Sequence, residues 1–253
     1  MTGIKAQLNL FYIALGFFTR IPMPQNIDFD QQKLNQASRY FPLVGWLIGI
    51  ICALSYWLFL PLFSNSIAIL LSMLVSILLT GCFHEDGLAD TCDGLGGGWT
   101  SEKKLSIMKD SRLGTYGAVA IWFALSLKWA ILIQIEQTWL AFLVAHPLSR
   151  TVANGMIYYL PYVSDTDTSK AKPLAEKMNK RNWHISIAIG AGSLLLIPDL
   201  IIKMLLLLIA LAIGISIYLK KQIGGFTGDT LGATQQLSEL TIYMVLLSAQ
   251  VNV

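Results

Sequence analysis

Charge is what this sequence has least of. Charged residues make up only 13% of its 253 residues, whereas hydrophobic residues make up 55%. A soluble domain carries about 25% charged residues, so the composition excludes an ordinary soluble protein and indicates an integral membrane protein. The net charge of +3 is too small and too dispersed for a nucleic-acid-binding protein, and we expect no nucleic-acid partner.

Cysteine is almost as scarce, with Cys52, Cys82 and Cys92 alone in the chain. Their spacing matches neither a zinc motif nor the even-numbered framework of a disulfide-stapled domain. Cys82 and Cys92 lie near His84, but they are mixed with aspartates, and soft and hard ligands suit different ions. The cysteines therefore do not predict a metal centre.

The N-terminal segment lacks the features of a removable leader. Its apolar run contains one lysine, is interrupted by Arg20 and has no small-residue cleavage site. We expect residues 6–22 to form a retained hydrophobic or interfacial helix, with a cleaved signal peptide as the alternative.

Long hydrophobic runs are what the sequence has in abundance. A helix needs roughly 20 apolar residues to cross the hydrocarbon core of a bilayer. The candidate spans are about 42–61, 66–83, 116–135, 138–160, 184–198, 200–219 and 231–250. The sequence thus predicts an all-α, polytopic membrane helix bundle with about seven transmembrane helices plus the N-terminal helix. We expect residues 1–253 to form one domain surrounded by membrane lipid. The sequence is compatible with a homo-oligomer and does not specify one.

The connections between the spans differ in length and charge. Those over 84–115, 161–183 and 220–230 are rich in lysine and arginine, whereas the short turns opposite them are nearly free of both. Because basic loops mark the cytoplasmic side, these segments are predicted to face the cytoplasm from a cytoplasmic (inner) membrane.

Four carboxylates follow the 66–83 run within the stretch "FHEDGLADTCDGLGGG": Glu85, Asp86, Asp90 and Asp93. On a helix, the three aspartates would lie within an arc of about 60°. Such like charges repel one another, and a divalent cation would neutralise them. Hard carboxylate oxygens suit Mg²⁺ or Mn²⁺, so the stretch predicts a metal site; the alternative is a helix end whose acids face water.

A basic stretch, "MKDSRLGTYG", precedes the next span. Lys109, Asp110, Ser111 and Arg112 lie at the start of a predicted helix, which is a suitable arrangement for binding phosphate. The alternative is that the two cations only anchor the chain at the membrane surface.

Polar residues also occur near and within the later spans. Thr227 and Asp229, in "GGFTGDTLGA", could cap the last helix. Alternatively, Thr227 could bind substrate, and Asp229 could join the acidic cluster as a ligand or base. Arg150 shares a helix face with His146 and could hold a phosphate or pair with Glu239. Ionisable residues inside membranes are functional candidates.

Taken together and in order, "GCFHEDGLADTCDG", "KDSRLGTYG" and "GGFTGDTLGA" closely resemble the motifs of cobalamin synthase, the adenosylcobinamide-GDP ribazoletransferase family. The resemblance also includes "FFTRIPMP" and "FPLVGWLIG" and extends over nearly the whole chain. Such membership implies a Mg²⁺-dependent transferase of the cytoplasmic membrane. The implied substrates are adenosylcobinamide-GDP and α-ribazole or its 5′-phosphate; adenosylcobalamin or its 5′-phosphate forms, and GMP leaves.

The residues fit the implied chemistry, because cleavage of a diphosphate develops negative charge that a cation stabilises. We expect Asp86, Asp90 and Asp93, with Glu85 beside them, to hold the metal. We expect Lys109 and Arg112 to grip the diphosphate. Asp229 or one of the three aspartates would accept the proton of the attacking hydroxyl.

Two other classes remain as alternatives. CDP-alcohol phosphotransferases of lipid head groups carry a similar acidic pattern, but Asp90 stands where their motif has an arginine. A cation transporter would place acids near the middle of the membrane, whereas most of these acids cluster at one end of a span.

Overall fold

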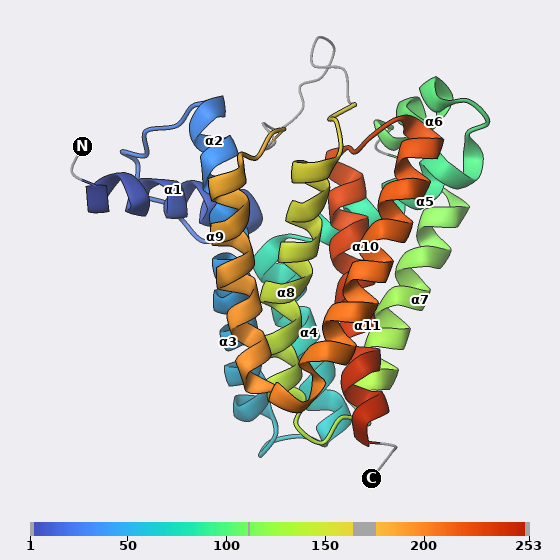
Figure 1. Ribbon diagram of the computed structural model, residues 1–253. Helices are drawn as coiled ribbons and strands as arrows, with labels where there is room; N and C mark the ends of the chain where they lie inside the picture. The colour runs from blue at the N-terminus through green and yellow to red at the C-terminus, as the bar shows by residue number, and fades with distance from the viewer. Residues whose placement is uncertain (1–2, 111, 164–175, 251–253) are drawn as a thin grey trace.

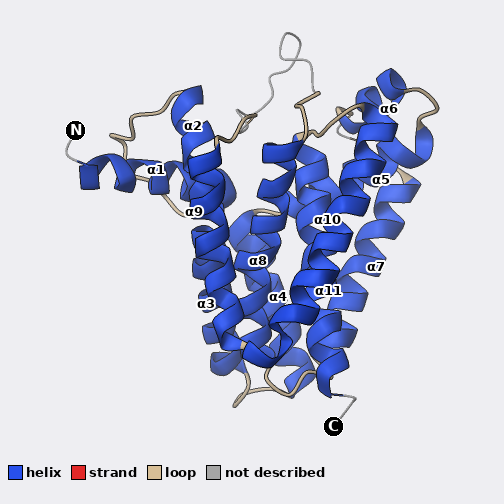
Figure 2. Cartoon of the chain, viewed as in Figure 1, coloured by secondary structure: helices blue, strands red, loops and turns tan. Residues whose placement is uncertain are grey.

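The computed structural model describes residues 3–110, 112–163 and 176–250, and these are almost entirely helical (Figures 1 and 2). Within them, the only pairing of extended backbone is an isolated bridge between Tyr162 and Phe226. The α-helices are α1 (Gly3–Phe18), α2 (Gln31–Ala37), α3 (Phe41–Phe59), α4 (Asn65–Thr80), α5 (Phe83–Gly97), α6 (Ser101–Met108), α7 (Thr115–Leu132), α8 (Thr138–Tyr159), α9 (Lys180–Ala191), α10 (Ile201–Ile223) and α11 (Gly228–Gln250). Three short 3₁₀ helices cover Ser38–Tyr40, Gly192–Leu196 and Pro198–Leu200.

The long helices run side by side, and short turns join them at the lower end of the bundle in Figure 1. Helices α2 and α6 lie at the upper end, and α1 extends sideways from the bundle near that end. Helix α1 leaves Ile4 and Leu8 exposed while burying Leu10 and Ile13. This position is consistent with the predicted interfacial helix.

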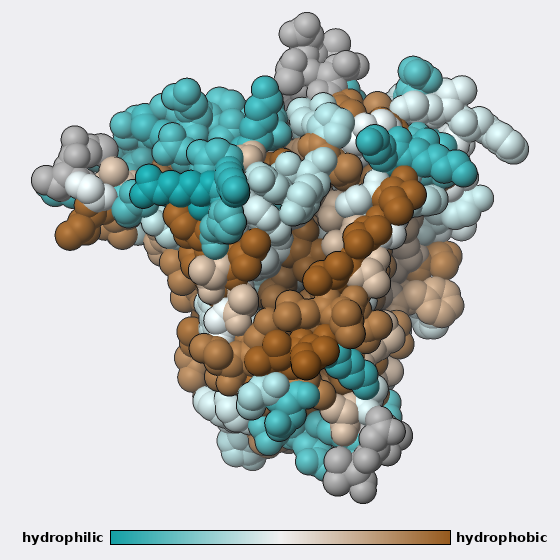
Figure 3. Space-filling view, in the orientation of Figure 1, coloured by the Kyte–Doolittle hydropathy of each residue, from teal (hydrophilic) through white to brown (hydrophobic). Residues whose placement is uncertain are grey.

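On the face shown in Figure 3, hydrophobic residues cover the middle of the bundle, with hydrophilic residues above and below them. By length and composition, three helical segments in the described part of the chain can cross a membrane: Gln31–Phe59, Thr115–Leu132 and Pro198–Ile223. A fourth crossing is possible if α4 and α5 count as one bent span. The all-helical fold is confirmed and its apolar helices are consistent with a membrane protein, but the predicted number of seven spans is not confirmed.

The remaining predicted spans fall short for physical reasons. Helix α9 has only 12 residues. Helices α8 and α11 carry polar residues such as Arg150 and Glu239, which lower their mean hydropathy but are buried among other helices. Mean hydropathy along the sequence therefore underestimates how deeply α8 and α11 are buried in the bundle.

Helices α3 and α8 pack through two glycines one turn apart. A Cβ atom on Gly49 would lie 2.7 Å from the carbonyl oxygen of Phe142, and one on Gly45 would meet the backbone of His146. Small residues at this spacing allow membrane helices to approach closely. The crossing fixes α8 in the centre of the bundle.

The structure corrects one feature of the acidic segment. The predicted 66–83 helix ends at Thr80, and the chain turns through Gly81 and Cys82, whose φ angles are 66° and 61°. Helix α5 then leaves at 84° to α4. The acidic residues are helical, as expected, but they lie on a helix that runs across the bundle rather than along it, because this turn breaks the span.

Candidate active site

Helices α5 and α11 cross at a pair of glycines. A Cβ atom on Gly87 would lie 2.8 Å from the carbonyl oxygen of Asp229, and one on Gly232 would lie 3.2 Å from the Cα atom of Gly87. Larger side chains would force the helices apart. This close crossing places Asp229 beside the helical turn that carries Asp86 and Asp90.

Three carboxylates gather around this crossing. Asp90 interacts electrostatically with Asp229, Asp86 and Asp93, and Asp229 interacts with Asp86. Asp86 is exposed, whereas Asp90 and Asp229 are half-buried. The sequence-based expectation that Asp229 joins the acidic stretch agrees with this arrangement. We call Asp86, Asp90 and Asp229 the rim cluster.

The rim cluster has the right chemistry for a hard cation, although its side chains do not enclose one. Among the described residues, no three His, Cys, Asp or Glu side chains are arranged as a metal-binding group. Mg²⁺ sites that act on phosphates commonly use only one or two carboxylates, and the substrate's phosphates complete the coordination. The oxygen-only donors of the rim cluster fit such a shared site.

Asp93, the third predicted aspartate, has a different environment. It is buried, and its two carboxylate oxygens accept hydrogen bonds from the backbone N–H groups of Gly114 (2.7 Å) and Gly117 (2.9 Å). A carboxylate at a helix N-terminus stabilises the free N–H groups there. Asp93 thus fixes the start of α7 against α5.

This anchor also positions the basic stretch, because Arg112 precedes Gly114 by only two residues. Arg112 is bound to Asp110 by Nε–carboxylate contacts of 3.0 Å and an Nη2–Oδ2 ion pair of 2.5 Å. The guanidinium holds the pKa of the Asp110 carboxyl below its ordinary value. Lys109 follows the last residue of α6, and Ser111 lies outside the described residues. The loop therefore presents an exposed, oriented arginine near the α5 helix.

Thr227 acts as the cap of α11. Its backbone N–H donates to Thr230 Oγ1 (2.8 Å), and the Thr230 N–H donates to Thr227 Oγ1 (3.3 Å). Of the two roles predicted for Thr227, these bonds support capping.

Below the rim, a buried polar network joins α7 and α11. Glu239 accepts hydrogen bonds from Tyr243 (3.0 Å) and Gln235 (2.7 Å) and forms an ion pair with Lys128 at 3.0 Å. Lys128 also donates to Gln236 at 3.1 Å. Glu239 is only 2% exposed. We call these five residues the buried network.

Glu85 joins the buried network rather than the rim cluster. Its Oε1 atom accepts a hydrogen bond from Gln236 Nε2 at 3.0 Å, and it lines a small cavity with Lys128 and Glu239. A helix turns 100° per residue, so Glu85 points inward where Asp86 points outward. Of the predicted metal ligands, Glu85 and Asp93 are the two that the structure directs away from the rim.

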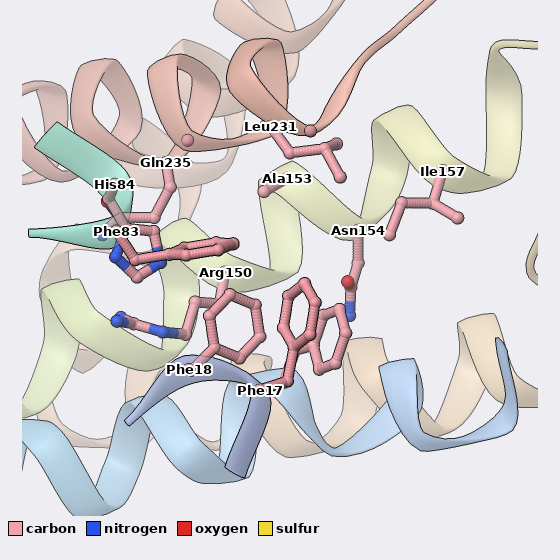
Figure 4. Close-up of a pocket in the computed structure, with 13 residues that line it drawn as sticks. Phe17, Phe18, Phe83, His84, Arg150, Ala153, Asn154, Ile157, Leu231 and Gln235 are labelled. Carbon is pink, nitrogen blue, oxygen red and sulfur yellow. The ribbon is translucent and has the colours of Figure 1, made fainter. Parts of the chain in front are cut away.

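Arg150 is likewise inside the bundle. Its Nη1 atom donates to the carbonyl oxygen of His146 at 2.9 Å, and its guanidinium lies 5.8 Å from the centre of the Phe18 ring. It interacts electrostatically with Glu239 and Glu85. Arg150 lines a cavity of about 20 Å³, which holds roughly one water molecule and no substrate (Figure 4). The geometry supports pairing with the buried network rather than a phosphate contact.

Sequence reasoning missed two features. It assigned no role to Lys128, although a lysine within an apolar run signals a buried partner. It also assigned none to Arg20, which interrupts the first apolar run and borders a large groove described below.

A helical membrane protein with carboxylates beside a basic loop at one end of the bundle has the layout of an enzyme that acts on phosphate esters at a membrane surface. Comparison with known proteins identifies the family within this class. Residues 10–247 match the model of the family described as cobalamin-5-phosphate synthase. The chain belongs to this family.

Curated relatives agree with the family match. The chain is 56% identical to the adenosylcobinamide-GDP ribazoletransferase of Shewanella pealeana and 53% identical to that of Shewanella piezotolerans, with 98% of each chain covered. It is 55% identical to the enzyme of the same name from Shewanella halifaxensis, over 96% of each chain. No solved structure matches the chain.

Proposed function

We propose that this protein is an adenosylcobinamide-GDP ribazoletransferase, which joins adenosylcobinamide-GDP to α-ribazole or its 5′-phosphate and releases GMP. The carrying observation is the full-length similarity to relatives of that name. The attachment of the Arg112 loop to α5 through Asp93 supports it, because the reaction needs carboxylates and cations near one another.

The residues of the site have separate roles in a phosphoryl-type transfer. Such a reaction depends mainly on positioning the substrates and on neutralising charge. A hydroxyl of the α-ribazole nucleoside attacks the phosphorus on the cobinamide side of the diphosphate, and GMP leaves. Arg112 and Lys109 bind the diphosphate oxygens. A carboxylate of the rim cluster, Asp229 or one on α5, accepts the hydroxyl proton. Asp93 holds the Arg112 loop in place.

A Mg²⁺ requirement is part of the proposal, and the chemistry of the rim cluster supports it. Asp86, Asp90 and Asp229 are the residues that would hold the ion, and oxygen donors without sulfur or imidazole suit it. When bound, Mg²⁺ supplies positive charge that stabilises the leaving phosphate.

The basic loops support a location in the cytoplasmic membrane with the active site on the cytoplasmic face. Lys103, Lys104, Lys109 and Arg112 lie at the same end as α6 (Figure 1). Positive loops of this kind stay on the cytoplasmic side.

The function is tested by incubating purified protein with adenosylcobinamide-GDP and α-ribazole 5′-phosphate. We expect GMP and a cobalamin product in equal amounts, loss of both with a chelator, and recovery on adding Mg²⁺. Release of CMP from a CDP-alcohol, without GMP release from the corrinoid, would contradict the proposal. GMP release that a chelator does not affect would contradict the proposed metal requirement.

Replacing Arg112 with alanine is expected to raise the KM for adenosylcobinamide-GDP roughly 10- to 100-fold, because hydrogen bonds to charged groups contribute about 1.5–3 kcal/mol. The fold should be unaffected, since the Arg112 side chain is 87% exposed. Arg181→Ala, a change of another exposed arginine, is the control and should have no effect. A change confined to the KM for the nucleoside would show that the diphosphate is placed wrongly.

A further inference from the structure

A groove of about 450 Å³ opens beside the rim cluster, between α1, the segment after it and the turn from α4 to α5. Asp86 forms one part of its wall and Arg20 another. Sites for small molecules commonly measure about 300–1,000 Å³, so the groove can hold a nucleotide. It is far too small for a corrinoid macrocycle.

Much of the lining is aromatic and aliphatic, and polar groups share it. Tyr12, Phe17, Phe29 and Phe83 contribute rings, and Ile27 adds an aliphatic side chain. Phe29 is 51% exposed although it is a large apolar residue. Aromatic faces of this kind bind flat apolar rings by stacking.

Arg20 brings a positive charge to this apolar surface. Its guanidinium lies against Gly81 at the turn between α4 and α5. Its backbone N–H donates to the carbonyl oxygen of Leu79 at 2.8 Å, but within the described part of the chain its side chain has no hydrogen bond or ion pair. An oriented arginine without a carboxylate partner is suited to a phosphate.

We propose that this groove binds the acceptor nucleoside of the reaction, with the benzimidazole-like base among the aromatic residues and the 5′-phosphate on Arg20. The inference rests on the proposed function. The other substrate carries a corrinoid that is too large for the groove, whereas the nucleoside fits within it. Asp86 links the groove to the rim cluster, so a nucleoside held here has its ribose beside the reacting phosphate.

The test measures apparent KM values of Arg20→Ala for three substrates. We expect the KM for α-ribazole 5′-phosphate to rise at least about tenfold, while the values for unphosphorylated α-ribazole and adenosylcobinamide-GDP stay within about twofold. Arg20→Lys, which keeps the charge, should recover part of the loss. Arg181→Ala should behave as the unmodified protein.

A second variant, Phe29→Ala, tests the aromatic wall without disturbing buried packing. It should raise the KM for both forms of α-ribazole alike. Equilibrium dialysis with labelled α-ribazole 5′-phosphate alone should show the same losses without any turnover. This readout separates the two proposals, because it measures the groove even if no GMP is released.

Three results would overturn the inference while leaving the ribazoletransferase assignment intact. The first is unchanged binding of α-ribazole 5′-phosphate by Arg20→Ala. The second is an equal loss for the phosphorylated and unphosphorylated nucleosides, which would make Arg20 a shaping residue only. The third is an effect confined to adenosylcobinamide-GDP, which would give the groove to the other substrate.

Discussion

Replacing Asp90 with asparagine is expected to lower the rate of GMP release about a thousandfold. Asp90 lies at the centre of the rim cluster, interacting with both Asp86 and Asp229. A cation held there contributes several kcal/mol to stabilising the transition state, and each 1.36 kcal/mol corresponds to about a tenfold change in rate. Asparagine keeps the shape of the side chain but removes its charge. The measurement is GMP release at saturating concentrations of both substrates.

The matched control for this change is Asp199→Asn, which alters an exposed aspartate at the opposite end of the bundle. It should leave the rate unchanged. The Asp90 variant should unfold at the same temperature as the unmodified protein or a higher one, since removing one of several repelling carboxylates relieves repulsion. A near-normal rate for Asp90→Asn at ordinary Mg²⁺ would remove this residue from the active site.

Neutralising Glu239 is expected to have the largest effect on stability. Glu239→Gln leaves Lys128 buried without its counter-charge, and breaking a buried ion pair in this way costs about 3–5 kcal/mol. Lys128 is buried, with only 6% of its surface exposed, and its other hydrogen-bond partner is the amide oxygen of Gln236. Unfolding in detergent, followed by intrinsic fluorescence, should show a large loss for the variant.

Two further variants separate charge from packing. Glu136→Gln makes the same chemical change at an exposed glutamate and should leave stability unchanged. The double variant Lys128→Met, Glu239→Gln removes both charges and should be more stable than Glu239→Gln alone, because no unpaired charge remains buried. If the double variant were no more stable than the single one, the Lys128–Glu239 ion pair would not be what stabilises this part of the bundle.

The sequence-based prediction and the structure differ most where helices contact one another. Hydropathy located every long helix, because apolar side chains facing lipid leave a signal in the sequence itself. The turn at Gly81–Cys82 was not predicted, since its left-handed backbone depends on how α5 packs after the break. The predicted number of seven spans is not confirmed for a similar reason: α8 and α11 bury polar side chains, and some of these contact each other across the two helices.

At the candidate site, too, the sequence identified residues but did not predict the environment of each side chain. The acidic stretch, the basic loop and Asp229 were found from composition and motif order. Helical periodicity placed Asp93 on the same face as Asp86 and Asp90, but the arrival of α7 gives its carboxylate two backbone N–H partners. Arg150 and Glu85 were candidates for substrate and metal because of their charge alone. Only the tertiary structure shows that both charges meet partners inside the bundle.

The central claim is that carboxylates from α5 and α11 together hold the divalent cation. Electron paramagnetic resonance of Mn²⁺ titrated into the purified protein measures this directly, because bound and free Mn²⁺ give different signals. The protein should bind Mn²⁺, and the double variant Asp90→Asn, Asp229→Asn should bind it at least about a hundredfold more weakly, as expected from losing two charged ligands. Equal affinity in the two proteins would contradict the account.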